Sequence, residues 1–185
     1  MRPHLLGIDD APFDKRQAEA VPLVGVMMEG PDLIEGVAID AFPVDGDGAT
    51  EHLAAWIGGL RWHASLQAVV LGGVTLAGLG LVDLAALAES LGRPVLAVTR
   101  RDTTASRLAS ALRAAGLTDR LPILDRLPPT RRLDDGLFLA CAGTDFAHAA
   151  RLVRTSLHKS SLPEPLRVAH LIGAALVRGA SHGRV

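Results

Sequence analysis

The first part of the chain contains three apolar segments whose ends are marked by polar or turn-forming residues. Residues 4–10 are apolar up to two adjacent carboxylates and are followed by a proline turn, residues 21–28 are almost entirely apolar, and residues 33–43 carry apolar side chains on both parities. Such short apolar runs, separated by turn residues such as 29–32, are typical of β-strands. Because the connections are short, we expect an antiparallel meander.

The pattern after residue 43 changes to alternating helices and strands. Apolar residues spaced three and four apart predict a helix at 51–60. The uncharged run 68–82 predicts a buried strand at 68–71, a glycine-rich loop and a helix from about Leu79 to Leu91. With the next strand, this unit would form a right-handed parallel crossover. The remaining expected elements are strands at 95–98, 121–124 and 137–142, helices at 104–115, 146–157 and 165–177, and a loop over 127–135.

Three antiparallel strands followed by a helix, and then by alternating parallel strands and helices, is the element order of a ribonuclease H-like fold. We therefore expect one α/β domain over residues 1–185, with a mixed sheet and helices on both faces. In this order the first strand lies between the meander and the parallel strands. Asp9 would then lie beside Gly72 and Gly73, at the carboxyl end of the first parallel strand, where ligands bind in such sheets.

The amino-acid composition limits the binding partners and the cellular compartment that we expect for this protein. The chain has 185 residues, of which 49% are hydrophobic, and this excludes a disordered chain. Its net charge is −1, so binding of nucleic acid would need a local basic patch. Aromatic residues make up 3%, which argues against a base-stacking platform. The single Cys141 forms no internal disulfide, and no segment resembles a signal peptide or a membrane span, so we expect a cytoplasmic protein.

Carboxylates recur at three expected element boundaries: Asp9 and Asp10, Asp45 and Asp47, and Asp83. Because side chains alternate along a strand, Asp9 and Asp10 should point to opposite faces. Two or three converging carboxylates bind Mg²⁺ or Mn²⁺, which stabilises the attacking and leaving oxygens of a phosphodiester. On this hypothesis Asp9, Asp10, Asp45 and Asp47 are metal ligands. The catalytic set is Asp9, Asp45, Asp47 and Asp83.

Each acid also has a plain structural interpretation. The first pair could end a strand in solvent, the second could form an acidic turn with a helix cap, and Asp83 could be a solvated helix residue. Among the cations, Arg100 and Arg101 follow a strand end, and we expect them, with Arg167, to contact phosphate. His170 lies within an apolar helix and is a candidate for acid–base chemistry, although a lone histidine is more often structural.

Several segments, taken together, carry a resemblance to a known family: Gly7-Ile-Asp-Asp-Ala-Pro-Phe, Pro22-Leu-Val-Gly-Val, Glu35-Gly-Val, Val44-Asp-Gly-Asp-Gly-Ala-Thr, Ala77-Gly-Leu-Gly-Leu-Val-Asp, Arg93-Pro-Val and Pro165-Leu-Arg-Val-Ala-His-Leu-Ile. They resemble the endonuclease dU family, a small prokaryotic family similar to endonuclease V. The resemblance covers nearly the whole chain. It implies a ribonuclease H-like fold and metal-dependent cleavage of DNA that carries a deaminated base, deoxyuridine in this branch.

The resemblance also assigns residues. Asp9 matches the first-strand aspartate of the endonuclease V metal site, and Asp45 or Asp47 falls where that enzyme has a glutamate at the end of its third strand. Gly72 and Gly73 replace an aspartate–glycine pair, for which Asp83 is a candidate substitute. Residues 29–32 replace the proline–tyrosine wedge, and the late catalytic histidine aligns nearer Leu166 than His170.

The leading hypothesis is therefore a Mg²⁺- or Mn²⁺-dependent endonuclease that acts on DNA. Two other functions remain open from the sequence: a non-catalytic protein of the same fold that binds nucleic acid or a nucleotide, and a phosphohydrolase of small metabolites.

Overall fold

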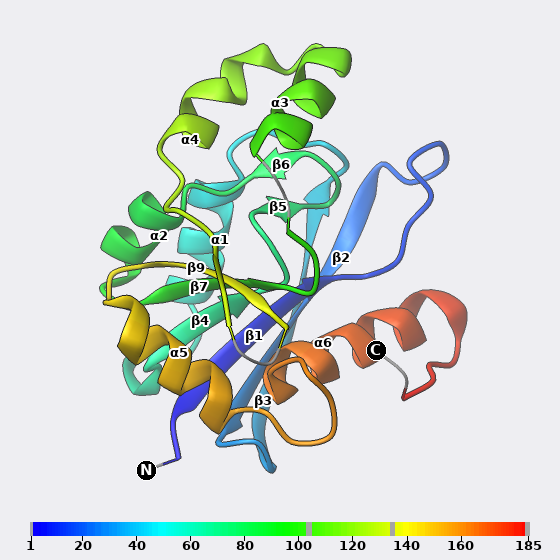
Figure 1. Ribbon diagram of the computed structural model, residues 1–185. Helices are drawn as coiled ribbons and strands as arrows, with labels where there is room; N and C mark the ends of the chain where they lie inside the picture. The colour runs from blue at the N-terminus through cyan, green and yellow to red at the C-terminus, as the bar shows by residue number, and fades with distance from the viewer. Residues whose placement is uncertain (1, 103–104, 134–135, 184–185) are drawn as a thin grey trace.

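A mixed β-sheet of seven strands, in the order β3-β2-β1-β4-β7-β9-β8, forms the centre of the protein (Figure 1). The computed structural model describes residues 2–102, 105–133 and 136–183. The strands of the sheet are β1 (His4–Asp10), β2 (Ala20–Glu29), β3 (Leu33–Pro43), β4 (Ala68–Leu71), β7 (Val95–Thr99), β8 (Arg131–Arg132) and β9 (Phe138–Ala142).

Strand β1 lies in the interior of this sheet, as expected from the element order. It pairs antiparallel with β2 and parallel with β4, and β2 pairs antiparallel with β3. Strand β7 runs parallel to β4. The meander and the parallel crossover are thus confirmed.

The direction of β9 differs from the expectation of parallel strands, because β9 runs antiparallel to β7. After β7 the chain enters helices α3 (Ala105–Ala114) and α4 (Leu121–Asp125), which lie beyond the end of the sheet instead of returning along it (Figure 1). The chain therefore re-enters the sheet at the end where it left, and this fixes an antiparallel pairing. We call α3, α4 and the 3₁₀ turn between them (Thr118–Arg120) the helical cap.

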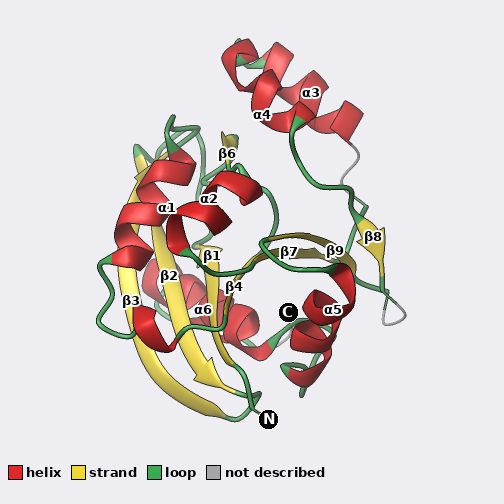
Figure 2. Ribbon diagram, turned by 90° about the vertical axis from the view of Figure 1, so that its left-hand side faces the viewer, coloured by secondary structure: helices red, strands yellow, loops and turns green. Residues whose placement is uncertain are grey.

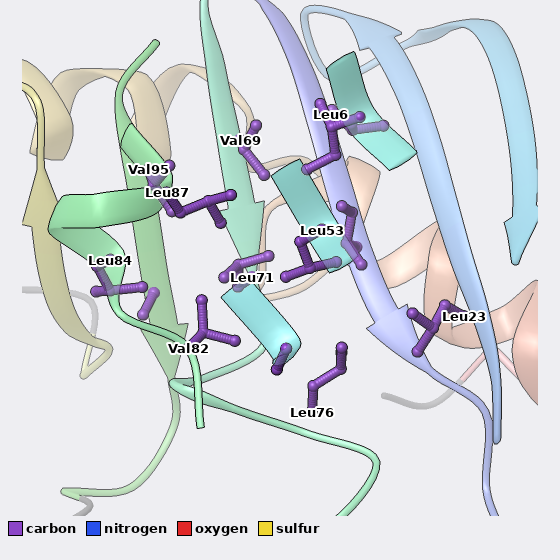
Figure 3. Close-up of a cluster of buried hydrophobic side chains, with 14 of the residues drawn as sticks. Leu6, Leu23, Leu53, Val69, Leu71, Leu76, Val82, Leu84, Leu87 and Val95 are labelled. Carbon is purple, nitrogen blue, oxygen red and sulfur yellow. The ribbon is translucent and has the colours of Figure 1, made fainter. Parts of the chain in front are cut away.

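Helices cover both faces of the sheet, as predicted. Figure 2 shows α1 (Ala49–Gly58) and α2 (Leu84–Leu91) on one face, and α5 (Phe146–Thr155) and α6 (Glu164–Arg178) on the other. The first pair buries Leu53 and Leu87 against the face that carries Leu6 and Val69 (Figure 3). Each such leucine contributes roughly 2 kcal/mol when it leaves water. A 3₁₀ turn (His63–Ser65) links α1 to β4.

Two predicted elements are wrong. The helix expected from Leu79 begins only at Leu84, because β5 (Thr75–Leu76) and β6 (Gly80–Leu81) form a small hairpin before it. The hairpin turn needs positive φ at Ala77 and Gly78, which a helix does not allow. Residues 121–124, expected as a strand, belong to α4, where Leu124 is buried in a cluster with Leu108 and Leu112 of α3. The predicted loop 127–135 contains the short β8, and Thr104 and Asp135 lie outside the described residues.

Helix α6 lies directly on the main chain of β1. A β-carbon built on Gly7 would overlap the main chain of Pro165 and Leu166. At the other end of the contact, a β-carbon on Gly173 would come 3.1 Å from the α-carbon of Ala11. The absence of side chains at these two positions therefore sets how closely the helix and the strand approach.

We expect Gly7→Ala to lower the free energy of unfolding by about 3 kcal/mol, because a methyl group there would force two main-chain segments apart. Urea denaturation would measure this loss. Gly58→Ala is the matched control, because a β-carbon at Gly58 meets nothing within 4 Å and α1 should keep its stability or gain up to ~1 kcal/mol. Equal midpoints for the two variants would contradict the close packing of α6 on β1.

Candidate active site at the carboxyl end of β1

Asp9 lies at the carboxyl end of β1, between β4 and helix α6. The register pairs Ile8 with Leu71, which brings Asp9 beside Gly72. A β-carbon on Gly72 would lie 3.0 Å from Asp9 Oδ1, so the glycine leaves open space next to this oxygen. The other oxygen, Oδ2, lies 2.8 Å from Nδ1 of His170 on α6. Because an ionised carboxylate only accepts hydrogen bonds, we assign the proton to Nδ1 of His170.

The His170–Asp9 pair forms part of the wall of a cavity of about 340 Å³. Arg100 and Arg101, which follow β7, line the same cavity. The structure thus brings together four residues that the sequence analysis selected from three distant segments. Arginine side chains beside a carboxylate–imidazole pair suit the binding of a phosphate group.

Electrostatics favour a protonated imidazole in this pair. The hydrogen bond to Asp9 raises the pKa of His170 above its ordinary value, although partial burial acts in the opposite direction. The side chain of His170 is 42% exposed, compared with 19% for Asp9. The ring therefore reaches the cavity, and Nε2 is the ring nitrogen that the bond to Asp9 does not use.

Asp10 faces the opposite side of the sheet, as alternation along a strand predicts. Its Oδ2 accepts a hydrogen bond of 2.8 Å from the main-chain N–H of Ala77 in the hairpin turn. Burial raises the pKa of Asp10, and the neighbouring Asp9 carboxylate raises it further. Both acids line a second cavity of about 260 Å³, together with Gly72, Gly73 and Gly78.

The other predicted carboxylates have partners of their own. Asp45 Oδ1 accepts hydrogen bonds from Nζ of Lys15 at 2.9 Å and from the N–H of Leu79 at 2.7 Å. Asp83 accepts from the N–H groups of Ala85 and Ala86, so it is the N-cap of α2, and it pairs with Arg126 at 3.0 Å. The remaining acid, Asp47, is exposed in a separate cavity that it shares with Asp83.

The predicted convergence of three acids on one ion is therefore not present in this arrangement. Among the residues that the structure describes, one group of three ligating side chains has its ligand atoms within 4.8 Å of one another: His4, Glu29 and Glu35. Lys15 holds Asp45 at the hairpin, away from this group. Metal binding at Asp9, Asp10, Asp45 and Asp47 stays a prediction. The catalytic roles of Asp9, Asp45, Asp47 and Asp83 also stay predictions.

Asp9 and Asp10 offer ligand atoms of the kind that Mg²⁺ or Mn²⁺ prefers, and both line the same cavity. Both supply hard oxygen donors at the same strand end, and Gly72 leaves the space beside Asp9 that a side chain would fill. Mg²⁺ is commonly held by one or two carboxylates, with water and substrate phosphates at its other positions.

Arg167, predicted to contact phosphate, is instead paired within α6. Its guanidinium donates to both carboxylate oxygens of Glu164, at 2.7 to 2.9 Å. Burial acts to raise the pKa of Glu164, but the hydrogen bonds from Arg167 and from the N–H of Lys159 outweigh it, and the pKa is lowered. This pair holds the beginning of α6, and Arg100 and Arg101 are the arginines that reach the cavity next to Asp9.

A third and larger cavity, of about 520 Å³, was missed by the sequence analysis. It lies between the helical cap and the ends of β7 and β9, and it shares Gly72 and Gly73 with the cavity of the two acids. The run of glycines at 72, 73 and 78 was the available signal, since it removes side chains from the walls. The lining is mainly apolar and includes Val74, Leu79, Leu108, Leu124, Leu127, Pro128 and Pro129, with Thr75, Thr99, Asp102 and Thr130 as polar residues.

Known proteins resemble this chain along nearly its whole length. A family model described as endonuclease dU matches residues 2–177. The UPF0215 protein of Methanothermobacter thermautotrophicus is 37% identical over 183 residues, which cover 97% of this chain and 90% of the relative. A solved protein of unknown function from Archaeoglobus fulgidus has a TM-score of 0.88 at 29% identity, covering 96% of this chain and 100% of the other.

A more distant likeness confirms the ribonuclease H-like fold. Endonuclease V of Ciona intestinalis, solved in complex with a 24mer DNA containing an inosine followed by a ribo-adenosine, has a TM-score of 0.57 at 11% identity, covering 91% of this chain and 82% of that chain. Within the described part of the chain, no helix has the length and apolar character that a membrane crossing requires.

We expect Asp9→Asn to lower the pKa of His170 towards its ordinary value, because the amide removes the negative charge that stabilises the imidazolium. An NMR titration of the imidazole in metal-free protein would measure the pKa. Since the pKa is raised in the folded protein, the associated stabilisation is complete below the unfolded pKa of about 6.5 and is lost as the pH rises through the folded pKa. Identical titration curves for wild type and variant would contradict the pairing.

Proposed function

The chain belongs to the endonuclease dU family, and on that premise we propose that it is a metal-dependent endonuclease that cleaves DNA at a deaminated base, with deoxyuridine as the base. One observation carries the proposal. The carboxylates of Asp9 and Asp10, the imidazole of His170 and the arginines at 100 and 101 surround two adjoining cavities at one end of the sheet. The solved complex of the Ciona endonuclease V with DNA supports DNA as the substrate class.

In this proposal each side chain has a defined task. Arg100 and Arg101 bind and orient the phosphate through charge-assisted hydrogen bonds. Asp9 and Asp10 would hold the divalent ion, which would stabilise the charge that develops on phosphodiester oxygens. Water attacks the phosphorus and loses a proton to solvent, and the bond from phosphorus to the leaving oxygen breaks. His170, whose pKa is raised by Asp9, gives the proton on Nε2 to that leaving oxygen.

The apolar cavity gives the base a place outside the duplex. Enzymes that recognise a damaged base in DNA take it out of the stack into a pocket, where its edge meets polar groups. The cavity of about 520 Å³ adjoins the acids through Gly72 and Gly73. Its threonines offer hydroxyl groups to the edge of a base.

We expect the purified protein to cut a duplex with one deoxyuridine in the presence of Mg²⁺ or Mn²⁺ and to leave the matched thymidine duplex intact. Asp9→Asn should reduce the rate at least about 100-fold, because a charge-neutral amide binds the ion poorly and stabilises the phosphodiester oxygens less. Glu89→Gln, which neutralises an exposed carboxylate on α2, is the control and should cut normally. Gel analysis of end-labelled strands gives the rates.

Other outcomes decide between the functions left open. If the protein binds DNA tightly with or without the metal and cuts no strand, the result would support a non-catalytic binding protein. Release of phosphate from free nucleotides, without cleavage of DNA, would support a phosphohydrolase.

His170→Gln should lower the rate of cleavage by roughly 10²-fold, because glutamine can still hydrogen-bond to Asp9 but gives no proton. The loss should be smaller for a substrate whose leaving oxygen is replaced by sulfur, since a thiolate needs no protonation. Single-turnover rates on the two substrates would measure this. An equal loss on both would remove His170 from proton transfer.

A further inference from the structure

Arg120 is a buried cation whose side chain donates hydrogen bonds to main-chain oxygens. It ends the 3₁₀ turn of the helical cap and is only 4% exposed. Its Nη1 donates to the carbonyl of Leu79 at 2.6 Å and its Nη2 to the carbonyl of Asp45 at 2.8 Å. Within the described residues, no carboxylate lies within ion-pair distance of it, and its Nε is buried without a partner. Burying an unpaired charge lowers the stability of the folded protein. The two main-chain contacts of Arg120 therefore indicate a specific role for this residue.

The two carbonyls belong to loops that share an unusual backbone. Asp45 has φ 50° and Ala77 has φ 47°, and these are the non-glycine residues with positive φ among those described. The loops are joined directly, because the N–H of Asp45 donates to the carbonyl of Ala77 at 2.9 Å. Such backbone strain persists only where surrounding contacts enforce it, and the guanidinium of Arg120 supplies two of those contacts.

The hairpin turn at 77–79 links the contacts of Arg120 to the candidate site. Its N–H groups bind two carboxylates, Ala77 to Asp10 and Leu79 to Asp45. Gly78, between them, lines both the cavity of the two acids and the apolar cavity. The turn is therefore part of the wall between the two cavities. A shift of the turn would disturb the hydrogen bond that holds Asp10 and would change this part of the wall.

We propose that Arg120 is a positioning residue that fixes the 77–79 turn, and through it the Asp10 carboxylate and the wall of the apolar cavity. The catalytic part of this role rests on the proposed function. The planar fork of arginine holds two carbonyls on different loops at once, which the single ammonium of lysine does not reproduce. Substrate bound in the apolar cavity would thus meet Asp10 in a fixed relation.

Arg126 provides a matched control, because it anchors the same helical cap without touching the turn. Its side chain is 59% exposed and pairs with Asp83. If Arg120 only holds the cap in place, Arg120→Met and Arg126→Met should behave alike. If Arg120 positions the turn, only its own replacement should disturb residues 77–79.

The test compares amide hydrogen exchange in the peptide covering 72–82 in metal-free wild type, Arg120→Met and Arg126→Met. We expect exchange in this peptide to be at least about tenfold faster in Arg120→Met, and unchanged in Arg126→Met. Equal exchange in this peptide for both variants would overturn the proposal. If Arg120→Met does not fold, Arg120→Lys, which keeps the charge but reaches one carbonyl, takes its place with the same expected difference.

Kinetics on the deoxyuridine duplex form the second arm. We expect kcat to fall about 10²-fold in the Arg120 variant and to change less than twofold in Arg126→Met, because misplacement of a reacting group mainly affects the chemical step. An unchanged kcat together with faster exchange would overturn the catalytic part of the proposal. If wild type cuts no DNA, the proposed function fails, while the exchange experiment still decides whether Arg120 positions the turn.

Discussion

The contact between the main chains of β1 and α6 determines where the candidate site lies. Glycine at positions 7 and 173 lets the helix rest on the strand, with Pro165 above Gly7 and Gly173 beside Ala11. The helix therefore runs along β1 towards its carboxyl end. His170, one turn before Gly173, arrives 2.8 Å from Asp9 as a consequence. The pairing that raises the pKa of His170 thus depends on two positions that have no side chain.

The acids of this protein fall into two electrostatic classes. Asp45, Asp83 and Glu164 each form an ion pair with an adjacent cation, and each pair ties a loop or a helix end in place. Asp9 and Asp10 lie next to each other with no lysine or arginine paired to them among the described contacts, and burial together with mutual repulsion raises the pKa of Asp10. Adjacent acids of this kind are destabilising unless a proton, an imidazolium or a metal ion compensates them. A bound cation would therefore stabilise the folded protein most at Asp9 and Asp10.

The sequence predicts this fold well where the signals are local. Alternation and short turns identified the meander, and the position of β1 followed from the order of the elements. The failures are non-local: the apolar run around Gly78 suits a hairpin as well as a helix, and the direction of β9 depends on the path through the helical cap. In the site, Asp9, Arg100, Arg101 and His170 were selected because each follows a strand end or interrupts an apolar helix. The sequence did not indicate the ion pairs of Asp45 and Asp83, because their partners Lys15 and Arg126 are 30 and 43 residues away.

Gly72 shows how a lost side chain can organise a site. It lines all three cavities: that of the arginines and His170, that of the two acids, and the apolar one. Any side chain here would meet Asp9 Oδ1 at 3.0 Å and would separate these spaces. In the proposed endonuclease, Asp9 and Asp10 would be the acids that hold the ion at this strand end, and water and substrate phosphate would supply its other ligands. Because Gly72 has no side chain, these three cavities meet at one position of the main chain, next to Asp9.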